Sequence, residues 1–239
     1  MAITKRQTRA QFKTYKNVFD DHAERVLFRL SSQGHFKHLA EPISIGKEAN
    51  IFSAMKYGPN GEEQPIIVKI YRLETCDFNR MYQYIRYDTR FLNLKKKHRL
   101  IIFTWCRREF QNLLKAREAG CRVPTPIAFR DNVLLMEYIH GHGETRPSPR
   151  LKDRFPENPQ AFYEDVKQQM AKLNKAGLAH GDLSAFNILN RDEKPVLIDF
   201  SQCSPLDSAN AQELIERDHR NVDTFFKKLG VKIPERKQK

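Results

Sequence analysis

Residues 180–202, HGDLSAFNILNRDEKPVLIDFSQ, constrain the fold more tightly than any other stretch of the chain. Two short apolar runs, FNIL and PVLID, flank the polar turn NRDEK, and this pattern predicts two antiparallel strands. Asp182 and Asn187 belong to one loop at the start of the first run, and Asp199 ends the second run. Because paired strands bring these positions to the same end, we expect the three polar side chains to converge.

Two carboxylates and a carboxamide supply hard oxygen ligands, which suit Mg²⁺. Phosphoryl transfer needs a metal to neutralise phosphate charge, and it needs a carboxylate to accept the proton of the attacking hydroxyl. The spacing H-x-D-x-x-x-x-N, followed by an Asp about a dozen residues later, is that of protein-kinase catalytic sites. The pattern therefore predicts phosphoryl transfer at Asp182, Asn187 and Asp199.

A kinase also needs a lysine that binds the α- and β-phosphates of the nucleotide. Lys69 stands among alternating apolar residues in PIIVKIYR, where an unpaired ammonium group would be costly to bury. A glutamate from the next helix would lower that cost. Glu109 in CRREFQNLL is the better candidate for this partner, and Glu118 at the end of the same helix is the other.

A loop that covers the phosphates is expected between the first two strands, where the sequence reads ISIGKEANIF. It has one glycine, Gly46, which lets backbone amide groups approach a phosphate closely. The loop is not a Walker-type P-loop, because Glu48 follows Gly46 and Lys47 at the place where Ser or Thr is required.

The remaining segments predict an α+β chain of two lobes. A strand-rich part precedes a helix-rich part, and residues 140–160, rich in Pro, Gly and charge, join them. We expect an N-terminal basic tail and helix over 1–42, a first lobe over 43–139 and a second lobe over 140–239. Periodic apolar residues predict helices near 18–33, 103–119, 162–176 and 207–229, and strands joined by an Asp-Asn turn over 127–139.

The chain is strongly basic, with 42 Lys and Arg against 29 Asp and Glu and a net charge of +13. Such a charge attracts polyanions, whether nucleic acid, an acidic membrane surface or nucleotide phosphates. Residues 72–108 hold the densest basic run, with tyrosines interleaved, and 72–100 form a basic insert. There are two interpretations of this insert. Its aromatic residues stack on RNA bases while its basic residues contact phosphates, or it is a mobile loop whose aromatic residues pack on the domain.

The cysteines and the apolar runs favour a cytoplasmic protein. Four scattered cysteines without a CxxC pair argue against a zinc site and a disulfide framework. No apolar run approaches the roughly 18 residues of a membrane-spanning helix, and the basic N-terminus lacks the apolar core of a secretory signal.

Seven motifs stand out along the chain: SIGKEANIF, VKIYR, CRREFQNLLKAREAG, LLMEYI, HGDLSAFNIL, LIDFSQ and ERDHRNVDTFFKKLG. Together they resemble the RIO family of atypical serine/threonine protein kinases, and in particular its type-one branch in the compact archaeal form. The loop SIGKEANIF and the ending LIDFSQ, in place of D-F-G, are the most specific of these motifs. The resemblance covers residues 19–231.

The resemblance implies an ATP- and Mg²⁺- or Mn²⁺-dependent kinase of bilobal fold. Asp182 would be the proton acceptor, Asn187 and Asp199 the metal ligands, and Asp199 also the site of an aspartyl phosphate in an ATPase-like cycle. Lys69 would bind phosphate with Glu109 as its partner. The ATP-contacting residues would be Ile45, Gly46, Lys47 and Glu48 of the loop, and Met136, Glu137 and Ile139 of the hinge.

The family also implies autophosphorylation and a role in maturation of the small ribosomal subunit, with ribosomal RNA as the polyanionic partner. Two departures from ordinary kinases are visible. Gly181 stands where those enzymes have an arginine, and no A-P-E motif follows Asp199. The second lobe should therefore lack the extended platform that binds peptide substrates.

Asp218, in an otherwise apolar helix, is predicted to anchor the catalytic loop by accepting backbone hydrogen bonds; the alternative is a surface charge. Two other functions stay open. A small-molecule phosphotransferase of the aminoglycoside- or choline-kinase type also carries H-G-D-x-x-x-x-N, although the GKEAN loop argues against it. The chain could also be a non-catalytic ribosome assembly factor that senses ATP.

Overall fold

The computed structural model describes residues 19–58 and 60–234, and it divides the chain into two compact units. The first unit comprises residues 1–86, 91–111 and 125–138. The second comprises residues 87–90, 112–124 and 139–239. Most of the basic tail that the sequence predicts lies outside the described residues.

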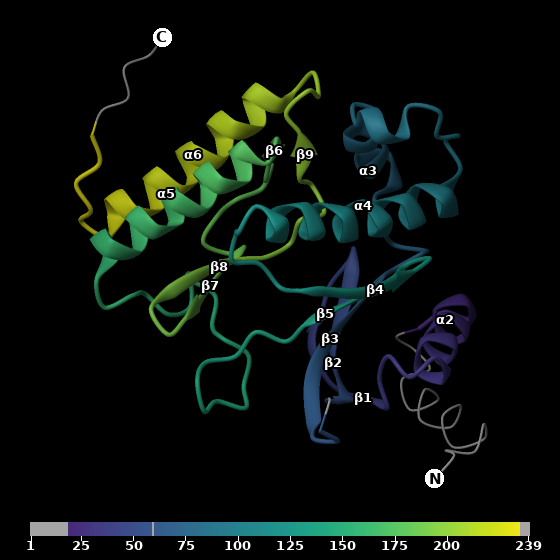
Figure 1. Cartoon of the computed structure of the whole chain (residues 1–239). Helices are drawn as coiled ribbons and strands as arrows, with labels where there is room; N and C mark the ends of the chain where they lie inside the picture. Colours follow the sequence, from purple (N-terminus) through teal and green to yellow (C-terminus); the bar gives the residue numbers. More distant parts are fainter. Residues whose placement is uncertain (1–18, 59, 235–239) are drawn as a thin grey trace. The chain divides into compact units, whose positions relative to one another are not determined.

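A five-stranded antiparallel sheet forms the centre of the first unit (Figure 1). Its order, β1-β2-β3-β5-β4, places the strand that carries Lys69 in the middle. The predicted Asp131-Asn132 turn joins β4 to β5. The strands are β1 (His38–Ile45), β2 (Ala49–Tyr57), β3 (Glu63–Tyr71), β4 (Pro126–Arg130) and β5 (Val133–Glu137).

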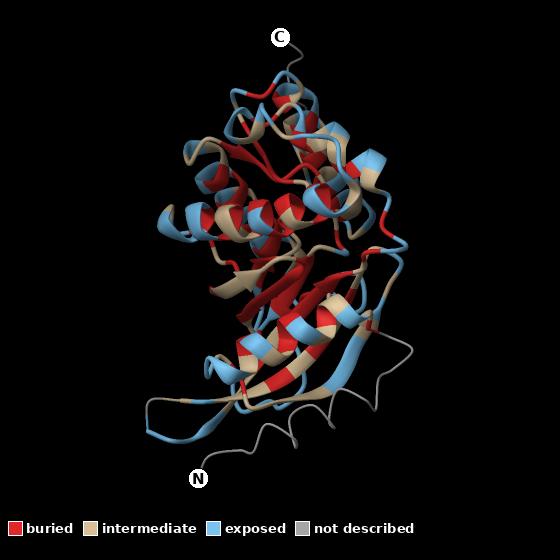
Figure 2. Cartoon of the chain, turned by 90° about the vertical axis from the view of Figure 1, so that its right-hand side faces the viewer, coloured by how far each residue is buried: buried red, intermediate tan, exposed pale blue. Residues whose placement is uncertain are grey.

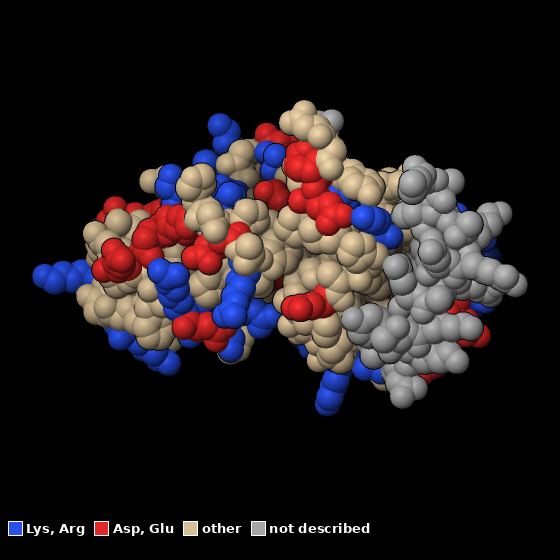
Figure 3. All heavy atoms as spheres, turned by 90° about the horizontal axis from the view of Figure 1, so that it is seen from below, with Lys and Arg blue, Asp and Glu red and all other residues tan. Residues whose placement is uncertain are grey.

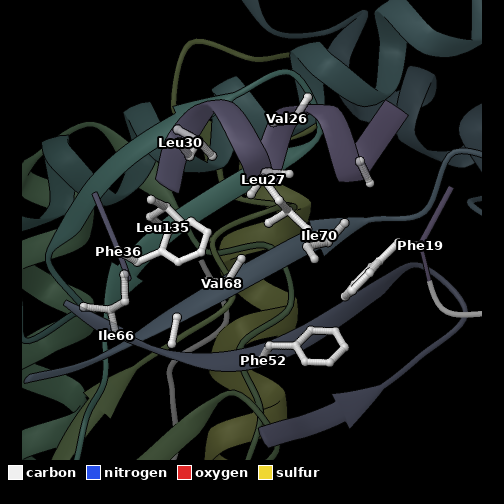
Figure 4. Close-up of a cluster of buried hydrophobic side chains, with 13 residues drawn as sticks. Phe19, Val26, Leu27, Leu30, Phe36, Phe52, Ile66, Val68, Ile70 and Leu135 are labelled. Atoms are coloured by element: carbon white, nitrogen blue, oxygen red, sulfur yellow. The ribbon is translucent and has the colours of Figure 1, made fainter. Parts of the chain in front are cut away.

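Helix α2 (Asp21–Ser32) covers one face of this sheet. It begins where the Asp20 carboxylate accepts a hydrogen bond from the Ala23 amide at 2.7 Å, and it follows the apolar periodicity of the sequence. Figure 4 shows Leu27 on the side of the helix that faces the strands. The buried residues of this cluster include Val26, Leu27 and Leu30 of the helix, and Val68, Ile70 and Leu135 of the strands.

The basic insert contains helical segments, which the sequence did not predict. It contains α3 (Phe78–Ile85) and the short 3₁₀ helix η2 (Thr89–Phe91), and α4 (His98–Glu118) begins before the predicted residue 103. Its aromatic residues do pack on the domain, since Phe78 contacts His98 and Tyr84 contacts Trp105 edge-on. Fully buried Ile101 and Ile102 extend the apolar face of α4 toward its N-terminus.

Two long helices and two short strand pairs make up most of the second unit. Helices α5 (Pro159–Lys175) and α6 (Ala211–Lys228) lie side by side (Figure 1), and the rings of Phe162 and Tyr163 contact Phe226. Helix α6 begins four residues after the predicted start. The strands are β6 (Leu178–Ala179), paired with β9 (Ser204–Pro205), and β7 (Ile188–Arg191), paired with β8 (Lys194–Leu197).

Burial follows these elements, with buried residues in the strands and along one side of the helices (Figure 2). On the face shown in Figure 3, the described basic and acidic side chains are interspersed and do not gather into a patch of one sign. In the described part of the chain, no helix is long and apolar enough to cross a membrane.

Candidate active site

The loop between β6 and β7 holds Asp182 and Asn187 together, as the sequence predicts. The Asn187 side-chain amide donates to the Asp182 backbone carbonyl at 2.8 Å and to its carboxylate at 3.2 Å. The Gln202 amide donates to the same carboxylate oxygen at 3.4 Å. These bonds fix the Asp182 side chain and leave the side-chain oxygen of Asn187 for another ligand.

Asp199 follows β8, and the backbone amide and carbonyl of its neighbour Ile198 both bond residues between β6 and β7, namely Asn187 and His180. The Ile198 amide donates to the Asn187 carbonyl at 3.0 Å, and the Ile198 carbonyl lies 3.0 Å from the His180 ring nitrogen Nε2. Asp199 itself has a φ of 61°, in the left-handed region that non-glycine residues seldom occupy. Backbone strain of this kind concentrates at functional sites.

Burial is the main cause that raises the pKa of the Asp182 carboxyl above its ordinary value. The nearby charge of Asp199 raises this pKa further, whereas His180 and Arg217 lower it. Two carboxylates that repel each other are a suitable environment for a divalent cation, which would relieve the repulsion.

Asp218 of α6 anchors this loop, and the prediction that it accepts backbone hydrogen bonds is confirmed. Its carboxylate accepts from the Gly181 amide at 2.9 Å and from the Leu183 amide at 2.8 Å, and the residue is only 3% exposed. The Asn221 side chain, also on α6, donates to the Leu183 carbonyl at 3.1 Å. The loop that carries Asp182 is thus bonded to a helix on either side of that residue.

Gly181 is required by geometry that sequence reasoning did not identify. Its φ is +80°, and a Cβ atom there would lie 2.8 Å from the Gln202 backbone carbonyl oxygen. A side chain is excluded both by the backbone conformation and by this close approach. Glycine avoids both the backbone strain and the close contact at this position.

We expect Gly181→Ala to lower the free energy of unfolding by about 2–4 kcal/mol, because strain at positive φ adds to the clash with Gln202. Gly143→Ala is the matched control. Gly143 has a φ of 74°, but no atom lies within 4 Å of the place that an added Cβ would occupy. This variant should therefore lose only the strain energy of about 1 kcal/mol. Urea unfolding of both variants measures the difference. Equal losses would show that the approach of Gln202 imposes no constraint.

The first unit holds Lys69 and Glu109 as a buried ion pair. Their charged atoms lie 2.8 Å apart, and the side chains are 7% and 1% exposed. Glu118, the other candidate partner, is exposed near the end of α4, beyond the part of that helix which belongs to the first unit. Pairing with Glu109 compensates the cost of burying the ammonium group on β3.

Tyr71 completes this pair and was missed by sequence reasoning. Its phenol donates a hydrogen bond to the second carboxylate oxygen of Glu109, and the Lys69 ammonium lies 5.1 Å from the centre of the Tyr71 ring. A signal was present, because residues two apart on a strand share a face. Tyr71 therefore had to lie on the same side of β3 as Lys69.

Tyr71→Phe should weaken catalysis by releasing one Glu109 oxygen. A hydrogen bond to a charged group contributes about 1.5–3 kcal/mol, so we expect a similar loss in the free energy of unfolding and a fall of roughly tenfold in kcat/KM for ATP. Tyr163→Phe is the control, since this phenol also donates to a carboxylate, that of Asp223 at 2.9 Å, in the second unit. The control should lose stability but keep kcat/KM; if both variants lost activity equally, Tyr71 would have no particular role.

The predicted ATP-contacting residues occupy the ends of strands. Ile45 ends β1 and Gly46 follows it, with the Gly46 amide donating to the Ala49 carbonyl at 3.1 Å. Met136 and Glu137 lie at the end of β5, and Ile139 begins the last segment of the second unit. The Glu137 carboxylate accepts from the Thr125 amide at 2.9 Å and its hydroxyl at 2.6 Å. The Glu137 N–H also donates to the Thr125 carbonyl at 2.8 Å, so an adenine contact at Glu137 would use its backbone carbonyl, and it stays a prediction.

Within the described residues, no three His, Cys, Asp or Glu side chains form a preformed metal site. The oxygen donors of Asn187 and Asp199 nevertheless fit Mg²⁺, which proteins commonly bind through one or two carboxylates together with substrate phosphates. These two residues would hold the ion, and the nucleotide would supply the rest of its coordination.

Comparisons with known proteins identify the family of this chain. The family model of the RIO domain matches residues 50–238. The chain is 42% identical over 221 residues to the RIO-type serine/threonine-protein kinase Rio1 of Haloferax volcanii, covering 92% of this chain and 74% of that one. It is 38% identical over 220 residues to the Rio1 kinase of Methanocaldococcus jannaschii, covering 92% and 73%.

Among solved structures, the Rio2 kinase–ADP/Mg²⁺–phosphoaspartate complex from Chaetomium thermophilum is similar in fold, with a TM-score of 0.67 at 22% identity. The similarity covers 92% of this chain and 64% of that one. It supports the predicted α+β kinase-like fold with a strand-rich and a helix-rich lobe. The family match and the archaeal relatives establish that the chain belongs to the RIO family of atypical serine/threonine-protein kinases.

Proposed function

We propose that this RIO-family kinase transfers the γ-phosphoryl group of ATP through a site built on Asp182, Asn187 and Asp199. The observation that carries the proposal is the catalytic loop itself. Asp218 bonds the loop backbone on both sides of Asp182, and Asn187 bonds the Asp182 carboxylate. Such preorganisation lets a base meet a substrate hydroxyl without further rearrangement.

Each residue has a role that follows from its charge and contacts. The Asp182 carboxylate accepts the proton of the attacking hydroxyl, and its raised pKa makes it a stronger base than an ordinary aspartate. The Lys69 ammonium, held by Glu109, binds phosphate oxygens of ATP. Asn187 and Asp199 would hold a divalent ion, which would neutralise charge on the phosphates. Ile45 to Glu48 bind the phosphates, and backbone groups of Met136, Glu137 and Ile139 bind adenine.

The phosphoryl acceptor in this proposal is a serine or threonine of the chain itself, or Asp199 followed by hydrolysis. The solved Rio2 structure contains a phosphoaspartate together with ADP and Mg²⁺, which supports an aspartate as acceptor in that protein. Transfer to Asp199 would release ADP, and water would then cleave the acyl phosphate. The chain would act as an ATPase in that cycle.

We further propose a cytoplasmic role in maturation of the small ribosomal subunit, with ribosomal RNA as the polyanionic partner. The net charge of +13 supports a polyanion. In the insert and α4 as far as residue 108, the acidic residues are Glu74 and Asp77, both exposed, and Asp88, which is fully buried and paired with Arg90 at 2.6 Å. The more numerous basic side chains exposed there include Arg80, Arg86, Lys95, Lys96, Lys97, Arg99 and Arg107.

Incubation with γ-labelled ATP and Mg²⁺ tests the proposed function. Label and released phosphate should appear with the wild type and vanish in Asp182→Ala and Asp199→Ala. Acid-stable label identifies Ser or Thr, and hydroxylamine-labile label identifies an acyl phosphate. A wild-type chain that binds ATP but neither labels itself nor releases phosphate would instead be the ATP-sensing assembly factor. Phosphorylation of a small alcohol without self-labelling would identify a small-molecule phosphotransferase.

A further inference from the structure

The loop of residues 46–48, between β1 and β2, is tied to the segment that follows β3. We call residues 72–80 the post-β3 segment. The Thr75 hydroxyl donates to the Lys47 carbonyl at 2.6 Å. The Arg72 backbone amide donates to the Glu48 carbonyl at 3.0 Å, and the Cys76 thiol donates to the same carbonyl at 2.9 Å.

Two charged side chains of the post-β3 segment add to these bonds. The Arg72 guanidinium donates to the Gly46 carbonyl at 3.4 Å, and the Arg80 guanidinium lies 4.0 Å from the Glu48 carboxylate. Three successive carbonyls of the loop, those of Gly46, Lys47 and Glu48, therefore accept hydrogen bonds from one short segment. The segment and the loop both belong to the first unit.

The orientation of these carbonyls determines that of the amide groups. In a planar trans peptide the C=O and the following N–H point in opposite directions. Bonds that turn the Gly46 and Lys47 carbonyls toward the post-β3 segment therefore turn the Lys47 and Glu48 N–H groups away from it. Neither of these two N–H groups has a hydrogen-bond partner in the described part of the chain.

We propose that Arg72, Thr75 and Cys76 are positioning residues, which hold the loop so that the Lys47 and Glu48 amides face the nucleotide phosphates. Successive amide groups with a common direction form an anion-binding site. The proposal rests on the proposed function, because it assumes that this loop binds ATP phosphates. It explains how a loop with one glycine could bind phosphate. The post-β3 segment fixes the orientation of the loop amides, which a glycine-rich turn would otherwise fix.

Thr75→Val tests the proposal, because it keeps the side-chain shape and removes the donor to Lys47. Thr75 is exposed, so its loss should leave the melting temperature nearly unchanged. We expect KM for ATP and Kd for ADP–Mg²⁺ to rise about three- to tenfold, because one hydrogen bond is lost. The value of kcat should stay within about twofold of the wild type. Thr75→Ser should restore both constants. Thr89→Val is the control, since this exposed threonine bonds Asp207 at 3.2 Å instead.

The possible results separate the inference from the proposed function. If Thr75→Val left KM and Kd at the wild-type values while Asp182→Ala still abolished turnover, the positioning role would be wrong and the site would stand. Equal increases in Thr75→Val and Thr89→Val would also overturn it. If the wild type bound no ADP–Mg²⁺ in calorimetry, both the inference and the proposed function would fail.

Discussion

Asp182→Asn is expected to reduce kcat for phosphoryl transfer by a factor of about 10²–10⁴, the range that general-base catalysis provides. The amide keeps the shape of the side chain and can still bond Asn187, but it cannot accept a proton. ATP affinity should stay within about threefold of the wild type, because Lys69 and the loop of residues 46–48 are unchanged. Steady-state kinetics and nucleotide titration measure the two quantities.

Asp153→Asn serves as the control for charge alone, since Asp153 is exposed and pairs with Lys152 at 3.1 Å. It should behave as the wild type. If Asp182→Asn retained more than about a tenth of the wild-type kcat, Asp182 would not act as the proton acceptor.

The raised pKa of Asp182 predicts the pH dependence of the wild type. Burial disfavours the carboxylate, so kcat/KM should fall with decreasing pH at a value above the ordinary aspartate pKa of about 3.9. The same burial makes ionised Asp182 a cost to folding that is present at neutral pH and disappears below the unfolded pKa. Asp182→Asn should therefore melt no lower than the wild type at pH 7, and its advantage should vanish near pH 4.

Asp218→Ala is the variant with the largest expected loss of stability. It leaves the Gly181 and Leu183 amides without the acceptor that they now share, and each unsatisfied buried group costs about 1–3 kcal/mol. We expect the apparent free energy of unfolding to fall by about 2–5 kcal/mol, with ATP turnover largely lost because the Asp182 loop is no longer held. Urea unfolding and phosphate release measure the two effects.

Asp218→Asn separates the two effects of this change. Its one carbonyl oxygen can accept from one amide, while its NH₂ group faces the other donor, so its stability should be intermediate. Glu216→Gln, an exposed change on the same helix, should alter stability by less than about 0.5 kcal/mol. Normal melting together with normal turnover in Asp218→Ala would show that the loop does not depend on this anchor.

Much of this site could be predicted because its chemistry is local in the sequence. Asp182, Asn187 and Asp199 flank one strand pair, so spacing alone brings their positions together. Lys69 stood out because a charged residue interrupts an apolar strand, and Asp218 because it interrupts an apolar helix face. In each case the cost of burying a charge implied a partner.

The parts that could not be predicted depend on tertiary contacts. Gly181 has to be glycine because the Gln202 carbonyl approaches it, and that approach depends on how the chain returns after β8. Helix α3 was missed because it is short and has only two buried residues, Met81 and Ile85, so its apolar periodicity is weak. The post-β3 segment carries no motif, because its hydrogen bonds go to backbone carbonyls.

The Lys69–Glu109 pair has a consequence for how such an enzyme can be controlled. Many protein kinases are switched by moving the helix that carries this glutamate, so that the ion pair forms only on activation. Here both charges are buried, and Tyr71 bonds the glutamate from the same strand as the lysine. Rotating the helix outward would leave a buried ammonium group without its counter-ion, at a cost of about 3–5 kcal/mol. An inhibitor or regulator that competes with the nucleotide or with the phosphoryl acceptor would avoid this cost, whereas one that displaces α4 would not.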